Sequence, residues 1–72
     1  MTRGQHMRAC RIAAGLSLRE LGEKAGVQFV TVCRLENDRH AGNIATIELL
    51  ADALGVSIDE YIGHKPGEAD EA

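Results

Sequence analysis

The chain has 72 residues, with 8 lysines and arginines against 11 aspartates and glutamates, so its formal net charge is −3. This length allows one small domain, and a hydrophobic fraction of 44% is that of a folded chain. No apolar run approaches the roughly 20 residues of a membrane span, and no signal segment opens the chain. We therefore expect a cytoplasmic protein without a membrane partner. The acidic total argues at first against nucleic acid as a partner.

Two cysteines, Cys10 and Cys33, are too few for a disulfide framework or a zinc site. We expect Cys10 to fill a core position, and for Cys33 a structural role is favoured over redox sensing. The histidines lack metal-ligand spacing, and no Ser/His/Asp or Cys/His arrangement or glycine-rich phosphate loop is recognisable. The sequence therefore indicates no enzyme, metal, cofactor or small-molecule ligand.

The first helix is predicted over residues 5–14, and Gly15 is expected to end it. Residues 1–4 precede it as a short N-terminal arm. The apolar residues at helical spacing are Met7, Cys10, Ala13 and Ala14.

The second helix is predicted to begin at Ser17 and to stop at Gly26. Ser17 and Glu20 have the spacing of a capping box, in which each side chain satisfies a free backbone N–H group near the other. The third segment, residues 28–36, has a phenylalanine, two valines and a threonine in close succession. These residues favour a strand, whereas the apolar spacing favours a helix, so local sequence leaves both open.

A fourth helix is predicted between the cap residue Asn43 and Gly55, and a short fifth helix between Ser57 and Gly63. The buried face of the fourth is expected to consist of Ile44, Ile47, Leu50, Ala51 and Leu54. Residues 63–72 are polar, small and acidic, which predicts a flexible acidic tail.

The segment from residue 18 to residue 35 has the residues that two steeply crossing helices need. Gly22 is small enough for close backbone contact, and Gly26 tolerates the positive φ that opens a tight turn. The hydrophobic residues that fill the angle between the helices are Leu18, Leu21, Val27, Val32 and Leu35. This spacing is that of a helix-turn-helix, and it favours a helix over residues 28–36.

The run GLSLRELGEKAGVQFVTVCRLEND, followed by TIELLADALGVSIDEYI, resembles the Xre-type, lambda-repressor-like helix-turn-helix family. The resemblance covers residues 5–62. It implies an all-α, five-helix DNA-binding domain whose second and third helices form the helix-turn-helix. Four positions depart from the usual residue of that family: Gly22 for alanine, Leu18 for a polar phosphate-binding residue, Asp38 for glycine, and Gly42 for proline.

The resemblance implies that the third helix enters the DNA major groove. The base contacts it implies are Gln28, Phe29, Val30, Thr31 and Arg34. Arg34 suits guanine, Gln28 suits adenine or a phosphate, and the apolar groups suit thymine methyls. The alternatives are that Phe29 and Val30 belong to the core and that Arg34 is an ordinary solvated arginine.

The candidate phosphate contacts are Arg8, Ser17, Arg19, Lys24, Asn37 and Arg39. Asn37 has a second possible role, which is to cap the third helix. Arg3 is either a DNA-contacting residue of the arm or part of a disordered terminus. The resemblance implies that Arg11 forms a structural salt bridge with Glu36 rather than a DNA contact.

The net charge conceals two unlike halves. Residues 1–39 contain seven basic and four acidic side chains, a net charge of +3, whereas residues 40–72 contain one basic and seven acidic side chains, a net charge of −6. The negative total is therefore compatible with a DNA-binding surface in the first half.

We predict a sequence-specific, double-stranded-DNA-binding transcriptional regulator of the bacterial or phage repressor type. It is expected to be a homodimer on an inverted repeat, since a lone domain contacts few base pairs. Its dimer interface is predicted at Ile58, Tyr61 and Ile62. The alternative is a protein-interaction module of the same fold, such as an antitoxin that pairs with a toxin.

Overall fold

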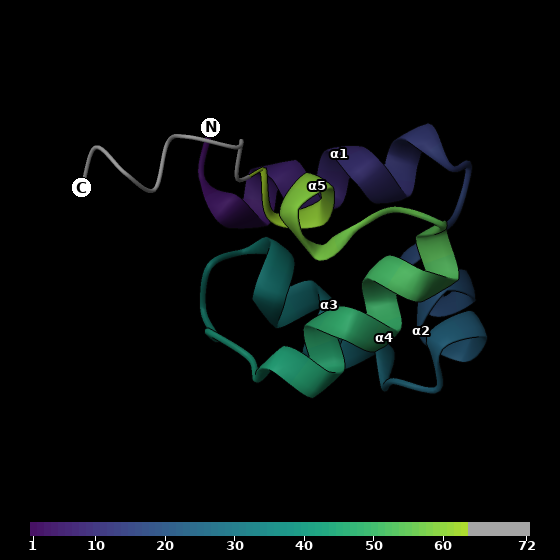
Figure 1. Ribbon diagram of the computed structural model, residues 1–72. Coiled ribbons are helices and arrows are strands. Elements are labelled where there is room, and N and C mark those ends of the chain that lie inside the picture. Colours follow the sequence, from purple (N-terminus) through teal and green to yellow (C-terminus); the bar gives the residue numbers. More distant parts are fainter. Residues whose placement is uncertain (64–72) are drawn as a thin grey trace.

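The computed structural model describes residues 1–63, which form five helices joined by short turns (Figure 1). In chain order the helices are α1 (Arg3–Ala13), α2 (Leu18–Ala25), α3 (Phe29–Glu36), α4 (Ile44–Leu54) and α5 (Ile58–Ile62). Helix α1 packs on α3 and α5, and α2 packs on α3 and α4. The predicted all-α, five-helix fold is confirmed. None of these helices is long and apolar enough to cross a membrane. The predicted acidic tail, except Gly63, lies outside the described residues.

Polar side chains determine where the helices begin. Ser17 Oγ accepts a hydrogen bond from the Glu20 backbone N–H at 3.1 Å, and Glu20 Oε1 accepts one from the Ser17 N–H at 2.9 Å, which forms the predicted capping box. The corresponding backbone donors of α1, α4 and α5 bond to the side chains of Thr2, Asn43 and Ser57. Helices α2, α4 and α5 end at glycines of positive φ, namely Gly26, Gly55 and Gly63. Capping residues readable in the sequence therefore determine most helix ends.

The segment with strand-forming residues is the helix α3. Val32 and Leu35 are buried three residues apart, while Phe29 and Val30 are 40% and 42% exposed. This spacing fits a helix and not the two-residue alternation of a strand. The β preference of such residues spans only about 1 kcal/mol, whereas burying one aliphatic side chain contributes about 1.5–3 kcal/mol. Burial in the core therefore outweighs local preference.

All five helices contribute to one core. Its buried apolar side chains are Met7, Leu21, Val32, Leu35, Ile47, Leu50, Ala51 and Tyr61. Tyr61 is 0% exposed, so its predicted place in a dimer interface is wrong. Helix α5 has only five residues, and Tyr61 is its one fully buried side chain. The Tyr61 hydroxyl has no hydrogen-bond partner among the described residues, and burial raises the pKa of this phenol well above its usual range.

Three residues that helical spacing places in the core lie on the surface instead. Ile44, the first residue of α4, is 65% exposed, and Ala13 and Ala14 at the end of α1 are also exposed. The spacing itself is correct, because the inner turns of both helices are buried.

The first residues of the chain belong to α1 and do not form an arm. Helix α1 begins at Arg3, two residues before the predicted start, and Thr2 is its N-cap. Arg3 Nη2 donates to the carbonyl oxygen of Ala41 at 2.6 Å. Arg3 is therefore bound to the loop between α3 and α4, so the predicted disordered terminus is wrong for this residue.

Asp38 attaches this first turn of α1 to the end of α3. The Thr2 hydroxyl donates to Asp38 Oδ2 at 2.6 Å, and the Gly4 backbone N–H donates to Asp38 Oδ1 at 2.9 Å. These two hydrogen bonds hold the pKa of the Asp38 carboxyl below its usual value. A Cβ atom at Gly4 would lie 2.5 Å from the Glu36 carbonyl oxygen and 2.7 Å from that of Leu35, so only glycine allows this close approach.

Candidate nucleic-acid interface

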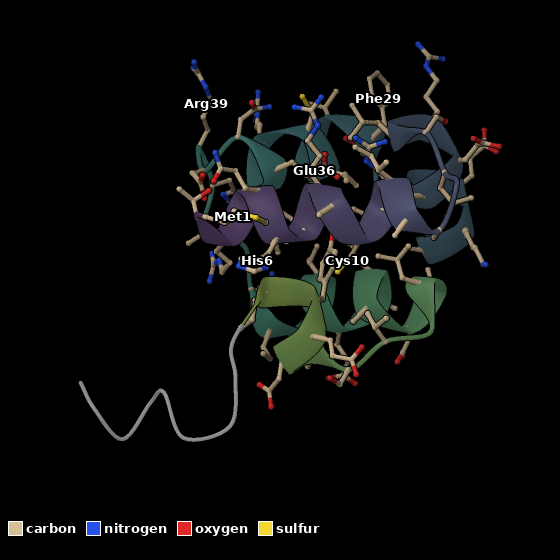
Figure 2. The ribbon with its side chains drawn as sticks, turned by 90° about the horizontal axis from the view of Figure 1, so that it is seen from above. Met1, His6, Cys10, Phe29, Glu36 and Arg39 are labelled. Carbon is tan, nitrogen blue, oxygen red and sulfur yellow. The ribbon has the colours of Figure 1, made fainter. Side chains whose placement is uncertain are left out.

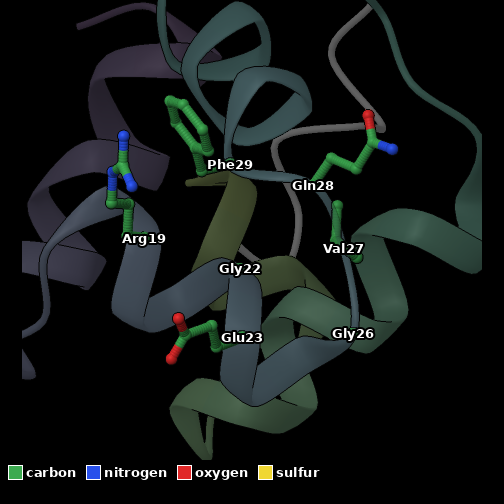
Figure 3. A pocket seen from close by; sticks show the side chains of 7 residues that line it. All are labelled: Arg19, Gly22, Glu23, Gly26, Val27, Gln28 and Phe29. Carbon is green, nitrogen blue, oxygen red and sulfur yellow. The ribbon is translucent and has the colours of Figure 1, made fainter.

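Helices α2 and α3 cross through a turn at residues 26–28, and two glycines allow this crossing. A Cβ at Gly22 would lie 2.6 Å from the Val27 carbonyl oxygen and 3.2 Å from the Phe29 backbone nitrogen, so the α2 backbone contacts the start of α3. Gly26 adopts a φ of +73°. Both glycines therefore have the roles predicted for them. Beside the turn lies an open cavity of about 330 Å³ that Phe29, Gln28 and the outer side of α2 line (Figure 3).

Helix α3 turns a mixed apolar and cationic side away from the core. Val30 and Arg34 are four residues apart and share this side, opposite the buried Val32 and Leu35. Phe29 lies on the flank that faces α2. Neither Phe29 nor Val30 belongs to the core, so the core alternative for these two residues is wrong.

The other two predicted base-contact residues lie at the edges of this side. Thr31 is half-buried, so only part of its side chain is available. Gln28 is the N-cap residue of α3, yet its exposed side chain makes no capping hydrogen bond. The Gln28 amide is therefore free to bind a base or a phosphate.

Four of the cations predicted to contact DNA, the base-contact candidate Arg34 and three phosphate-contact candidates, are exposed and have no partner within the described residues. Within residues 1–63, no hydrogen bond or ion pair engages the side chains of Arg8, Lys24, Arg34 and Arg39. Figure 2 shows Arg39 and Phe29 projecting from the same side of the molecule. Arg19 is also exposed, and its guanidinium lies over the ring of Phe29.

Arg11 and Glu36 form an ion pair between α1 and the last turn of α3. Arg11 Nε and Nη2 donate to Glu36 Oε2 and Oε1 at 2.8 and 3.0 Å, and Arg11 Nη1 donates to the Leu16 carbonyl at 2.8 Å. The two side chains are only 11% and 4% exposed. The hydrogen bond to Glu36 raises the pKa of the Arg11 guanidinium. Arg11 is thus a structural residue, with its donors used inside the protein.

Two polar residues among the predicted phosphate contacts differ in what they can still donate. The oxygen of the Ser17 hydroxyl accepts the capping hydrogen bond, which leaves its hydrogen free for a phosphate. Asn37 Nδ2 donates to the carbonyl oxygen and to the sulfur of Cys33, at 2.8 and 3.5 Å. The Asn37 amide thus caps α3 and is engaged within the protein, whereas the Ser17 hydroxyl hydrogen is not.

Cys10 has a structural position, and Cys33 lies on α3. Both are half-buried free thiols, and Cys10 packs against the core. Burial raises the pKa of the Cys10 thiol, whose sulfur lies 3.6 Å from the Glu60 carbonyl oxygen. A raised pKa lowers the fraction of reactive thiolate.

The acidic half of the chain lies away from this interface. Helices α4 and α5 contain four exposed carboxylates and no lysine or arginine: Glu48, Asp52, Asp59 and Glu60. Figure 2 shows both helices on the side of the molecule opposite Phe29 and Arg39. The separation of charge along the chain is therefore also a separation in space.

The stacking of Arg19 on Phe29 was not predicted from the sequence. The two residues are ten positions apart on different helices, so their proximity depends on the crossing angle of α2 and α3. The attachment of α1 was also missed, although Thr2 and Gln5 have the spacing of a capping box.

Comparison with known proteins identifies relatives of this fold. Residues 7–61 match the helix-turn-helix family. The chain is 32% identical over 65 residues to the immunity repressor protein of Bacillus phage phi105, a match that covers 90% of this chain and 45% of that protein. The chain thus spans about half the length of this curated relative. It also resembles the crystal structure of the hypothetical transcription factor NHTF from Neisseria, with a TM-score of 0.78, 28% identity, and coverage of 96% of this chain and 77% of the other.

Proposed function

The chain belongs to the helix-turn-helix family, whose Xre-like members are DNA-binding regulators and not enzymes, and on this premise we propose that it is a sequence-specific repressor of transcription. In this proposal α3 lies in the major groove of double-stranded DNA. The name of the phage phi105 relative, an immunity repressor, favours repression over activation.

The observation that supports this proposal most strongly is the exposed side of α3. Phe29 and Val30 are large apolar side chains left in water next to the free cation Arg34. On a helix inserted in the major groove, Arg34 binds the O6 and N7 atoms of guanine, while Val30, Phe29 and the Thr31 methyl contact thymine methyls. Gln28 binds adenine or a neighbouring phosphate.

Phosphate contacts around this helix position it on the duplex. We assign them to the exposed donors outside the base-contacting side, namely Arg8, Ser17, Arg19, Lys24 and Arg39. Such contacts supply affinity without sequence information. The acidic side formed by α4 and α5 is repelled by DNA and so favours binding through α3.

We further propose that two copies bind an inverted repeat, with half-sites about 34–36 Å apart, one turn of the double helix. Ile58 and Ile62 remain our candidates for the contact between copies. Both are half-buried and pack partly on their own core, which leaves the rest of each side chain for a partner. Sedimentation of the protein with a selected DNA site should show two chains per site.

Selection of bound sites from random duplex DNA tests the function. We expect a recovered palindrome and an affinity that falls steeply with salt, with a log–log slope of about −0.9 for each phosphate contact. Arg34→Ala should relax the preference at one base position of each half-site, at a cost of about 1–3 kcal/mol. Arg39→Ala is the matched control, because it should weaken all sequences alike and reduce the slope.

Two outcomes would refute these assignments. If Arg34→Ala weakens all sequences equally, Arg34 is only a phosphate contact. If no sequence is enriched and binding does not depend on salt, the chain is a protein-interaction module of the same fold.

A further inference from the structure

Arg19 and Phe29 form a stacked pair at the entrance of the helix-turn-helix. The Arg19 Cζ atom lies 4.7 Å from the centroid of the Phe29 ring, and both side chains are exposed. Figure 3 shows the guanidinium beside the ring, with Arg19 reaching across from α2 to the first residue of α3. The contact is therefore a cation–π interaction between the two helices of the motif.

The stacking on Arg19 is a side-chain contact that joins the Phe29 ring to α2. Gly22 contacts the backbone of Phe29 but has no side chain with which to hold the ring. The cavity of about 330 Å³ adjoins the ring and leaves it room to rotate. Arg19 is thus a contact of the ring that one substitution can remove.

The stacked arrangement leaves Arg19 able to bind DNA. A guanidinium that lies on an aromatic face keeps its N–H donors in its own plane, where they are free for a phosphate. Lysine has the same charge but no planar group that can stack in this way. The charge of Arg19 and its hold on Phe29 can therefore be separated by one substitution.

The Phe29 ring is suited to one feature of the major groove. It has no hydrogen-bonding atom, so it cannot distinguish donors from acceptors on base edges. The apolar group that the groove presents is the C5 methyl of thymine. Cytosine lacks that methyl, and 5-methylcytosine has it at the same position of the pyrimidine ring.

We propose that Phe29 recognises the 5-methyl group of a pyrimidine, in thymine and 5-methylcytosine alike, and that Arg19 is the positioning residue that holds its ring for this contact. This inference rests on the proposed function, since it requires α3 to lie in the major groove. It makes methylation of cytosine a signal that increases binding at one position of the site.

The test uses the DNA site selected above, in which each thymine of a half-site is replaced in turn by deoxyuridine. This change removes one methyl group and leaves the hydrogen-bonding pattern intact. The wild-type protein should lose about 4-fold in affinity at one thymine, the worth of one buried methyl. At that position 5-methylcytosine should bind more tightly than cytosine by a similar factor.

Variants then identify the residues responsible. Phe29→Ala should bind thymine and deoxyuridine equally at that position, and Phe29→Leu should retain part of the preference. Arg19→Lys should keep the salt dependence of the wild type but lose most of the preference for the methyl group. Val30→Ala tests the other exposed apolar side chain of the same helix. Ile44→Ala is the matched control, because it removes a 65% exposed apolar side chain from α4, outside the proposed interface, and should leave both the affinity and the preference unchanged.

Each result has one interpretation. If the wild type binds its site but no deoxyuridine substitution weakens it, the inference is wrong and the proposed function stands. If no DNA is bound, the proposed function is wrong. A preference lost in Val30→Ala but kept in Phe29→Ala would transfer the methyl contact to Val30. A full preference in Arg19→Lys would show that Arg19 does not position the ring.

Discussion

Replacing Arg11 by methionine should destabilise the protein more than replacing Arg11 and Glu36 together. In Arg11→Met the Glu36 carboxylate, 4% exposed, loses both of its Arg11 hydrogen bonds and its only ion-pair partner among the described residues. Breaking a buried pair by removing one partner costs about 3–5 kcal/mol. At roughly 0.05–0.15 kcal/mol per residue, a chain of this size has a total stability of about 4–11 kcal/mol, so the single variant should lose a large part of it.

The double variant Arg11→Met, Glu36→Leu removes the isolated charge as well. Apolar replacement of a buried ion pair is often neutral or stabilising by about 1–4 kcal/mol. We therefore expect the double variant to be more stable than Arg11→Met and near the wild type. Leu16 loses a donor to its carbonyl in both variants, so this effect cancels between them.

Urea unfolding followed by far-ultraviolet circular dichroism measures the difference. The midpoints should differ while the slope of free energy against urea stays the same. A double variant no more stable than the single one would refute this account.

Three further substitutions test other parts of the fold. Tyr61→Phe removes a buried hydroxyl without a partner in the described chain. The midpoint of thermal unfolding should therefore rise by about 4–8 °C, which corresponds to about 1 kcal/mol. A lower midpoint would mean that the hydroxyl is hydrogen-bonded. Gly4→Ala gains up to about 1 kcal/mol of helix preference. It also places a methyl group against the carbonyls of Leu35 and Glu36, which costs about 1–3 kcal/mol. Because the cost is larger, the urea midpoint should fall. Asp38 has a lowered pKa, so its hydrogen bonds contribute stability above its ordinary pKa of 3.8 and lose it as the pH falls through the folded-state value. Asp38→Asn should therefore be less stable than the wild type at neutral pH, and the two should converge in acid; a constant difference down to about pH 2 would contradict this.

The helix boundaries and the helix-turn-helix were predictable because short-range chemistry determines them. Ser17 with Glu20, and Gly26 at the end of α2, act within one or two turns of the chain. The positions of Gly22 and Val32 in the crossing likewise depend on a segment of fewer than twenty residues. Local patterns of this kind leave few alternatives, and here they also outweighed the β preference of α3.

Predictions failed where the result depends on what covers a helix. Ile58, Tyr61 and Ile62 are all apolar within a helix of five residues, and spacing alone does not say which of them turns inward. Ile44 has the correct spacing for the buried side of α4, but it is the first residue of that helix and is 65% exposed. The base contacts remain predictions, because they depend on a partner and not on the fold.

The attachment of α1 to Asp38 has a consequence for the order in which the chain folds. Gly4 and Asp38 are 34 residues apart, and closing a loop of that length costs conformational entropy before the contact forms. The two helices of the motif, in contrast, are joined within residues 18–36 and can associate early. Substitution of Asp38 should therefore accelerate unfolding and leave the folding rate nearly unchanged. The backbone amide hydrogens of the first turn of α1 should exchange with solvent through local opening. Those of α2 and α3 should exchange only when the whole domain unfolds.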